Sequence, residues 1–175
     1  MNDLGQLNHA LAYSLHGLDS GQTQLRPRKR KNRWSIQQIV EHLLLTYSST
    51  EEAIAARLAK GRSTRSKPGL MQRISQYTVI RLGYFPRGRK APALVMPLAE
   101  TAAPLSGEEL AHRVREQLLR LHELCNDAEK AFGEKQFASH HVLGPLSVAQ
   151  WRRFHLIHGE HHARQILAIR KEHGV

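Results

Sequence analysis

Cysteine is almost absent from the sequence, since only Cys125 occurs among 175 residues. A single cysteine cannot form a disulfide framework within the chain, and it excludes a zinc finger built on several cysteines. The first residues lack a basic start followed by an apolar run, so we expect no signal peptide and a cytoplasmic location. No apolar run approaches the ~18 residues that a membrane span requires, so we expect no membrane partner.

Acidic residues are scarce relative to basic ones. Asp and Glu number 15 against 26 Lys and Arg, which gives a formal net charge of +11. The excess is concentrated in residues 26–33, with six cations in eight residues, and in a second zone at 57–90. Such clusters can bind phosphate backbones, attract an anionic substrate or remain in solvated loops. No aromatic residue is interleaved in the first run for base stacking, so we expect a loop there and consider nucleic acid an unlikely partner.

The chain is long enough to bury a core, and we expect a single domain over residues 1–175. Apolar residues at helical spacing, with capping boxes that start at Ser35, Ser106 and Ser147, predict four long amphipathic helices. Their expected ranges are 4–18, 35–60, 106–132 and 147–172. No convincing pair of strands is visible, and residues 139–146 are expected to form a loop. The predicted fold class is therefore an all-α helical bundle.

A long connection, residues 62–104, joins the second and third of these helices. Apolar residues at helical spacing predict a short helix at 69–82, and glycine and proline predict turns after it. Residues 93–103 are expected to be extended. A connection this long inside a compact domain is commonly a functional crossover or a lid.

Three histidines are expected on the inner faces of helices. His158 and His162 lie four residues apart on the apolar stripe of the last helix, and His42 lies among apolar neighbours on the second. Three neutral imidazoles with a fourth position open form the ligand set of a catalytic zinc site. His161, about 60° from His158 around the helix, is the fallback for His162. The alternative is that these are buried histidines hydrogen-bonded to their neighbours.

Other residues of the last helix bear on this interpretation. His155 lies one turn before His158 and could line the same pocket, as could His161. Glu160 points away from the apolar stripe, so the carboxylate of a protease-type H-E-x-x-H motif is missing.

Two segments of the chain resemble DinB-like proteins. The segment from Pro27 through Arg33-Trp-Ser-Ile to His42-Leu resembles the surroundings of their first metal histidine. The segment from Leu146-Ser-Val-Ala-Gln-Trp through His158 and His162 to Gln165-Ile resembles their last helix, which carries the second and third ligands. The resemblance spans almost the whole chain. It implies an up-down-down-up four-helix bundle, often dimeric, with a divalent metal such as zinc or nickel on three histidines.

The resemblance also indicates an activity. Some DinB-like proteins are thiol S-transferases that use bacillithiol, mycothiol or glutathione. A metal ion on three neutral ligands lowers the pKa of a bound thiol or water, so that either transfer of a thiol or hydrolysis of a small substrate remains open. Arg87, Arg89 and Lys90 on the crossover could hold the carboxylates of an acidic thiol, or could simply be solvated. The crossover and the turn before the last helix are not general family features, which indicates a separate branch.

Two further questions stay open at this level. A non-enzymatic alternative is a basic bundle that binds nucleic acid or another protein, with structural histidines, and a third possibility is a metal that only stabilises the fold. Leu156, Ala163 and Leu167 lie roughly opposite the His158 stripe on the last helix. Apolar residues on that side predict either a homodimer or burial beneath the first helix.

Overall fold

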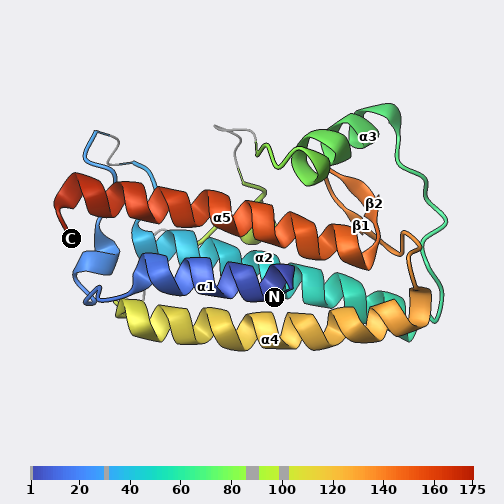
Figure 1. The fold of residues 1–175 in the computed structure, drawn as a ribbon, viewed down its shortest axis with the longest axis horizontal. Helices are drawn as coiled ribbons and strands as arrows, with labels where there is room; N and C mark the ends of the chain where they lie inside the picture. Colours follow the sequence, from blue (N-terminus) through green and yellow to red (C-terminus); the bar gives the residue numbers. More distant parts are fainter. Residues whose placement is uncertain (1, 30–31, 86–90, 99–102) are drawn as a thin grey trace.

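The computed structural model describes residues 2–29, 32–85, 91–98 and 103–175, and most of them are helical. Four long helices run along the long axis of the molecule (Figure 1): α1 (Asp3–Leu15), α2 (Ile36–Ala59), α4 (Gly107–Phe132) and α5 (Val148–His173). The helices α1 and α5 run in one direction, and α2 and α4 run in the other (Figure 1). The predicted all-α, up-down-down-up bundle is confirmed, with helix boundaries within three residues of those expected.

Capping explains where three of the long helices begin. The side-chain oxygen of Ser35 accepts from the backbone N–H of Gln38, and the Gln38 side chain accepts from the N–H of Ser35. The same reciprocal pair forms at the starts of α4 and α5. Each box satisfies two N–H groups that would otherwise lack an intrahelical partner. All three predicted capping boxes are therefore present.

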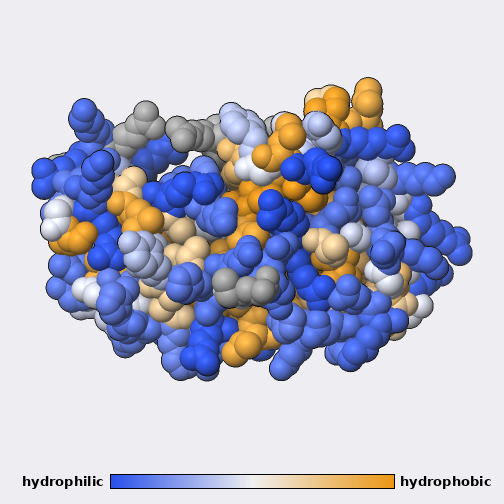
Figure 2. Space-filling model, in the orientation of Figure 1, coloured by the Kyte–Doolittle hydropathy of each residue, from blue (hydrophilic) through white to orange (hydrophobic). Residues whose placement is uncertain are grey.

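The core lies between the four helices, where α1 packs against α5 and α4, and α2 packs against α4. Aliphatic side chains dominate it, and many of them are fully buried: Leu7, Leu11, Leu15, Ile36, Leu43, Ile54, Leu110, Leu121, Leu146 and Leu156. The surface on the side seen in Figure 2 is mostly hydrophilic, with hydrophobic side chains gathered at the upper right over α3 (Leu70–Gln76). Within the described residues, no helix is both long and apolar enough to cross a bilayer.

The crossover between α2 and α4 contains the predicted short helix. It forms α3 and then continues as the π-helical turn η2 (Tyr77–Arg81). The Gln76 side-chain amide donates to the carbonyls of Leu143 and Pro145, which ties α3 to the turn before α5. Residues 93–103 were expected to be extended. At the start of that range the chain instead forms the 3-10 turn η3 (Ala93–Val95).

The expectation of a loop at 139–146 was wrong. Two short antiparallel strands, β1 (Ala138–His140) and β2 (Gly144–Leu146), pair there in a hairpin. The His140 Nδ1 accepts from the backbone N–H groups of Val142 and Leu143, at 3.1 Å each, which closes the turn. Strands of three residues are too short to show an alternation of apolar and polar residues, so periodicity could not reveal them.

The side of α5 opposite the histidine stripe is partly covered within the chain. Leu156 and Ala163 are buried, whereas Leu167 keeps 36% of its surface exposed. Because α1 packs along α5, burial by the first helix accounts for Leu156 and Ala163 without a second copy. The homodimer stays a prediction.

Two glycines mark where backbones approach closely, and they give a testable contrast in stability. A Cβ at Gly107 would overlap the carbonyl oxygen of Leu15, a backbone atom, whereas a Cβ at Gly159 would overlap a methyl of Leu7. A leucine side chain can rotate away, but the backbone of α1 cannot yield without moving the helix. Gly107→Ala is therefore expected to lower the free energy of unfolding by about 1–3 kcal/mol, and Gly159→Ala by less. Urea denaturation of both variants tests this, and equal or reversed losses would contradict it.

Candidate metal centre

Three histidine side chains from two helices meet inside the bundle. His42 comes from α2, and His158 and His162 come from successive turns of α5; all three are buried. One nitrogen from each ring lies within 4.8 Å of the other two. The His158 Nε2 lies 3.3 Å from the His42 Nε2 and 3.1 Å from the His162 Nε2. The structure thus brings together the three histidines that the sequence analysis selected as metal ligands.

Hydrogen bonds on the outer side of the cluster determine where two of the ring protons lie. The His42 Nδ1 lies 2.7 Å from the carbonyl oxygen of Val95. The His162 Nδ1 lies 2.9 Å from the Gln165 Oε1, whose amide nitrogen is 3.0 Å from the His161 Nε2. Carbonyl oxygens only accept, so both Nδ1 atoms carry the proton. The Nε2 atoms of His42 and His162 therefore present lone pairs to the centre of the cluster.

The inner geometry of the cluster fits a cation. A proton on the His158 Nε2 can be donated in line to His42 or to His162 but not to both, so at least one of the two short nitrogen–nitrogen contacts lacks a hydrogen bond and is repulsive. A divalent ion between the three nitrogens turns this repulsion into attraction. With Zn–N bonds of ~2.0–2.1 Å, tetrahedral geometry places ligand nitrogens about 3.3 Å apart. The two shorter nitrogen separations, 3.1 and 3.3 Å, agree with that spacing.

Burial keeps these imidazoles neutral, the form that binds metal. It lowers the pKa of His42, and it lowers that of His158 well below its usual value. The pKa of His162 falls to about 3, through burial first and then the neighbouring His42 and His161. Neutral imidazoles do not need to lose a proton to bind a metal ion at neutral pH.

Aromatic rings surround the cluster. The Trp34 ring lies 4.8 Å from that of His42, centroid to centroid. The rings of Phe85 and Phe154 lie 4.9 and 5.4 Å from the His158 ring. These side chains limit the water around the three histidines, which strengthens electrostatic interactions at the centre.

A second group of buried polar atoms lies next to the cluster on α5. His155 is completely buried, with its ring 5.3 Å from Tyr47 and 5.9 Å from Trp151. Both ring nitrogens of His155, the Tyr47 hydroxyl, the Trp151 Nε1 and the His158 Nδ1 have no hydrogen-bond partner among the described residues. Burial lowers the pKa of His155 to about 3.

The remaining predicted site residues have different positions. His155 was expected to line a substrate pocket, but a fully buried side chain has no surface for a substrate to contact. His161 is half-buried beside Phe85, with ring centroids 5.2 Å apart, and lies outside the metal-binding geometry formed by the described residues. Arg87, Arg89 and Lys90 lie outside the described residues.

Three contributions to the site were missed at the sequence level. The Val95 carbonyl reaches His42 from the crossover, 53 residues away, and nothing in the pattern around Val95 indicates this. Phe85 likewise reaches His158 from the crossover. Gln165 lies within the resembling motif and one turn from His162, and that spacing could have identified it as the residue that orients the ring.

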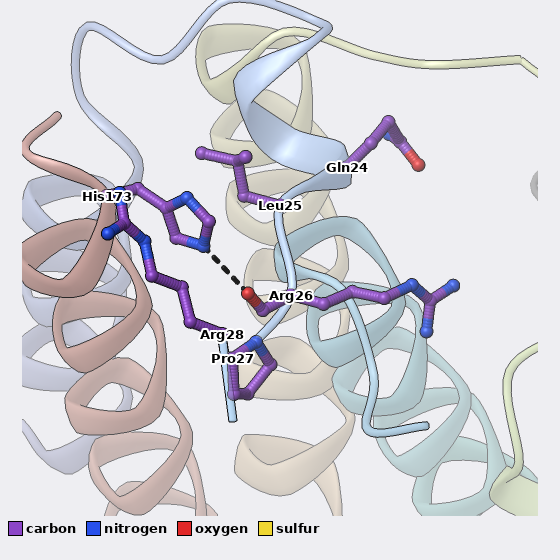
Figure 3. A pocket seen from close by; sticks show the side chains of 6 residues that line it. All are labelled: Gln24, Leu25, Arg26, Pro27, Arg28 and His173. Carbon is purple, nitrogen blue, oxygen red and sulfur yellow. Dashed lines mark hydrogen bonds between the residues drawn. The ribbon is translucent and has the colours of Figure 1, made fainter. Parts of the chain in front are cut away.

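The basic run at 26–33 precedes α2 and contacts the end of α5. His173 donates from its Nε2 to the Arg26 carbonyl at 2.8 Å, as seen in the pocket of Figure 3. The Arg28 backbone N–H donates to the Glu172 carboxylate, also at 2.8 Å. The described residues of the run contain no helix or strand, as predicted, and these bonds give part of the run a structural role.

Comparison with protein families identifies a match over most of the chain. Residues 4–166 match the family model of the DinB superfamily. No curated protein and no solved structure matches the chain.

Proposed function

Because the chain belongs to the DinB superfamily, we propose that it is a metal-dependent enzyme in which His42, His158 and His162 hold a divalent cation. The observation that carries the proposal is the convergence of three buried imidazole nitrogens, two of which have their lone pairs directed inward by hydrogen bonds behind them. Zinc and nickel are the candidates, since both accept imidazole nitrogen.

The protein residues have distinct parts in this proposal. Val95 and Gln165 hold the His42 and His162 rings in the ligand tautomer, an arrangement that also raises the basicity of the ligands. Trp34, Phe85 and Phe154 limit the water around the histidines. A divalent cation on three neutral ligands keeps its charge for a fourth position, where it lowers the pKa of a thiol or a water.

Transfer of a low-molecular-weight thiol to an electrophile is the activity we favour, with hydrolysis of a small ester or amide second. Family membership supports the first, and the three-nitrogen donor set supports both. Bacillithiol, mycothiol and glutathione are the thiols to test first, with Arg87, Arg89 and Lys90 as candidate partners of their carboxylates.

The activity is tested with metal-loaded protein. The protein is incubated with each thiol and an electrophile such as a chlorinated aromatic compound, and separately with ester substrates. Thiol-dependent turnover that is lost with chelator and restored by zinc or nickel supports the transferase. Ester hydrolysis without thiol supports the hydrolase. If metal raises the thermal midpoint but neither reaction exceeds the rate of the His158→Ala variant, the metal is structural and the enzyme proposal fails.

The non-enzymatic alternative predicts a different result. We expect any DNA binding to be weak and to decrease by about 10³-fold or more between 50 and 200 mM salt, as phosphate contacts alone require. Fluorescence anisotropy with two unrelated duplexes tests this. Sequence-specific binding that survives 200 mM salt would favour the nucleic-acid alternative.

The proposal of a homodimer rests on the resemblance and on an exposed side chain of α5. We expect the homodimer to form in solution through Leu167, the exposed large hydrophobic side chain on α5. Light scattering that shows a monomer at high micromolar concentration would contradict this.

A further inference from the structure

A pocket separate from the histidines lies between the crossover and the start of α5. It has a volume of about 690 Å³. Arg73 and Tyr77 line it from α3 and η2, Arg81 from the end of η2, and Gln150 and Arg153 from the first two turns of α5. We propose that this pocket binds a ligand with a phosphate group. The proposal does not depend on the metal centre.

Three cations meet in the pocket without an anion to balance them. Within the described residues, no hydrogen bond or ion pair occupies the guanidinium groups of Arg73, Arg81 and Arg153, and no acidic residue lines the pocket. The adjacent Arg152, by contrast, pairs with Glu129 at 2.7 Å. Like charges that converge without a partner repel one another, so a bound anion would lower the energy of this arrangement. Guanidinium groups match the oxygens of phosphate in geometry as well as in charge.

The basic composition of the crossover and the N-terminal end of α5 also favour the binding of an anion. Residues 53–85, the described stretch that leads up to and includes the pocket segment, contain seven cations and no acidic residue. The first turn of α5 contributes Ala149 and Gln150 to the pocket wall. The N-terminal end of a helix carries a partial positive charge, which adds to the attraction for an anion. Together these features make the pocket a cationic site that lacks a counter-charge from the chain itself.

Apolar groups at the pocket indicate the rest of the ligand. Tyr77, 61% exposed, lies on the wall beside Ile80, and the neighbouring Leu70, Met71 and Ile74 of α3 are also exposed. Figure 2 shows hydrophobic side chains gathered over α3. The ligand class is therefore an organic phosphate with an aromatic or aliphatic part. Its source can be a soluble phosphate ester or the headgroup of a phospholipid.

The test measures binding of full-length protein to pyrophosphate and to adenosine diphosphate by calorimetry in 150 mM salt. In a second arm, it measures binding to vesicles of phosphatidylcholine with or without phosphatidic acid. We expect micromolar binding in at least one arm, weakened at least tenfold in Arg73→Gln/Arg81→Gln and in Arg153→Gln. The soluble probes and the vesicles distinguish the two sources. Because Tyr77 lies on the pocket wall, Tyr77→Ala should weaken the binding of adenosine diphosphate more than the binding of pyrophosphate.

Two matched controls separate the pocket from other sites. Arg113→Gln/Arg115→Gln removes the same charge from the exposed face of α4 and should leave binding unchanged. His158→Ala should also leave it unchanged, because His158 does not line the pocket. The proposal is overturned if neither arm shows binding at millimolar probe, if the α4 variant loses as much affinity as the pocket variants, or if His158→Ala abolishes binding.

Discussion

The His158→Ala variant is expected to lose bound divalent metal, with an affinity at least about 100-fold below that of the unmodified protein. His158 lies between the other two ligands, with its Nε2 3.1 Å and 3.3 Å from theirs. Its loss leaves two imidazoles on different helices and no replacement donor among the described residues. Even residues behind the ligands typically contribute 10–100-fold to metal affinity, so a direct ligand should contribute more. Equilibrium dialysis followed by elemental analysis measures the effect.

Two neighbouring positions provide controls for this prediction. His161→Ala removes an imidazole next to the cluster that is not one of its three donors, so it should keep the metal. Gln165→Leu removes the acceptor behind His162 and should weaken binding about 10–100-fold without abolishing it. Full metal content in His158→Ala, or a larger loss in His161→Ala, would contradict the assignment of the ligands.

Acidification from pH 7 to pH 5 is expected to destabilise metal-free protein by at least about 4 kcal/mol. Burial lowers the pKa of both His140 and His155 to about 3 in the folded chain, against 6.5 as the usual value. Between these values the unfolded chain binds a proton at each histidine and the folded chain does not. These two histidines therefore do not reduce the free energy of unfolding above about pH 6.5. They reduce it progressively as the pH falls from 6.5 toward 3. Each group contributes about 2 kcal/mol at pH 5.

Urea denaturation at pH 7 and pH 5, with chelator present, measures this dependence. The matched variant is His155→Phe, which keeps a ring among Tyr47, Trp151 and Phe154 and removes the titrating group. It should reduce the acid-induced loss by about 2 kcal/mol. Two results would show that these buried histidines do not control the response to acid. One is that His155→Phe loses as much free energy of unfolding between pH 7 and pH 5 as the unmodified protein. The other is that the unmodified protein is equally stable at both pH values.

The helical bundle could be predicted from the sequence because capping boxes and apolar spacing are local signals. A capping box specifies a helix start within four residues, and apolar spacing then identifies the inner face on which His42, His158 and His162 lie. No local signal specifies the relative heights of the helices. Counting residues from the ends of two antiparallel helices leaves His42 one to two turns from the α5 histidines, whereas the folded chain brings the His42 Nε2 to 3.3 Å from that of His158.

What could not be predicted depends on contacts between distant segments. The Val95 carbonyl orients His42 only because the crossover returns across α2, and no local pattern specifies that path. The pocket lined by Arg73, Arg81 and Arg153 forms only when α3 docks against the start of α5. That docking depends on contacts such as the hydrogen bonds from Gln76 to the hairpin turn. His155 was expected at a pocket wall because it lies one turn from His158, but spacing along one helix does not reveal the Tyr47 ring that faces it from α2.

X-ray absorption spectroscopy of the zinc-loaded protein tests the metal centre most directly. We predict one zinc ion per chain, with three imidazole nitrogens at ~2.0–2.1 Å and one further light-atom ligand. Addition of a thiol substrate should replace that light atom with sulfur at ~2.3 Å. A spectrum with fewer than three imidazoles, or failure of the protein to take up zinc at all, would contradict the proposal that His42, His158 and His162 form a metal site.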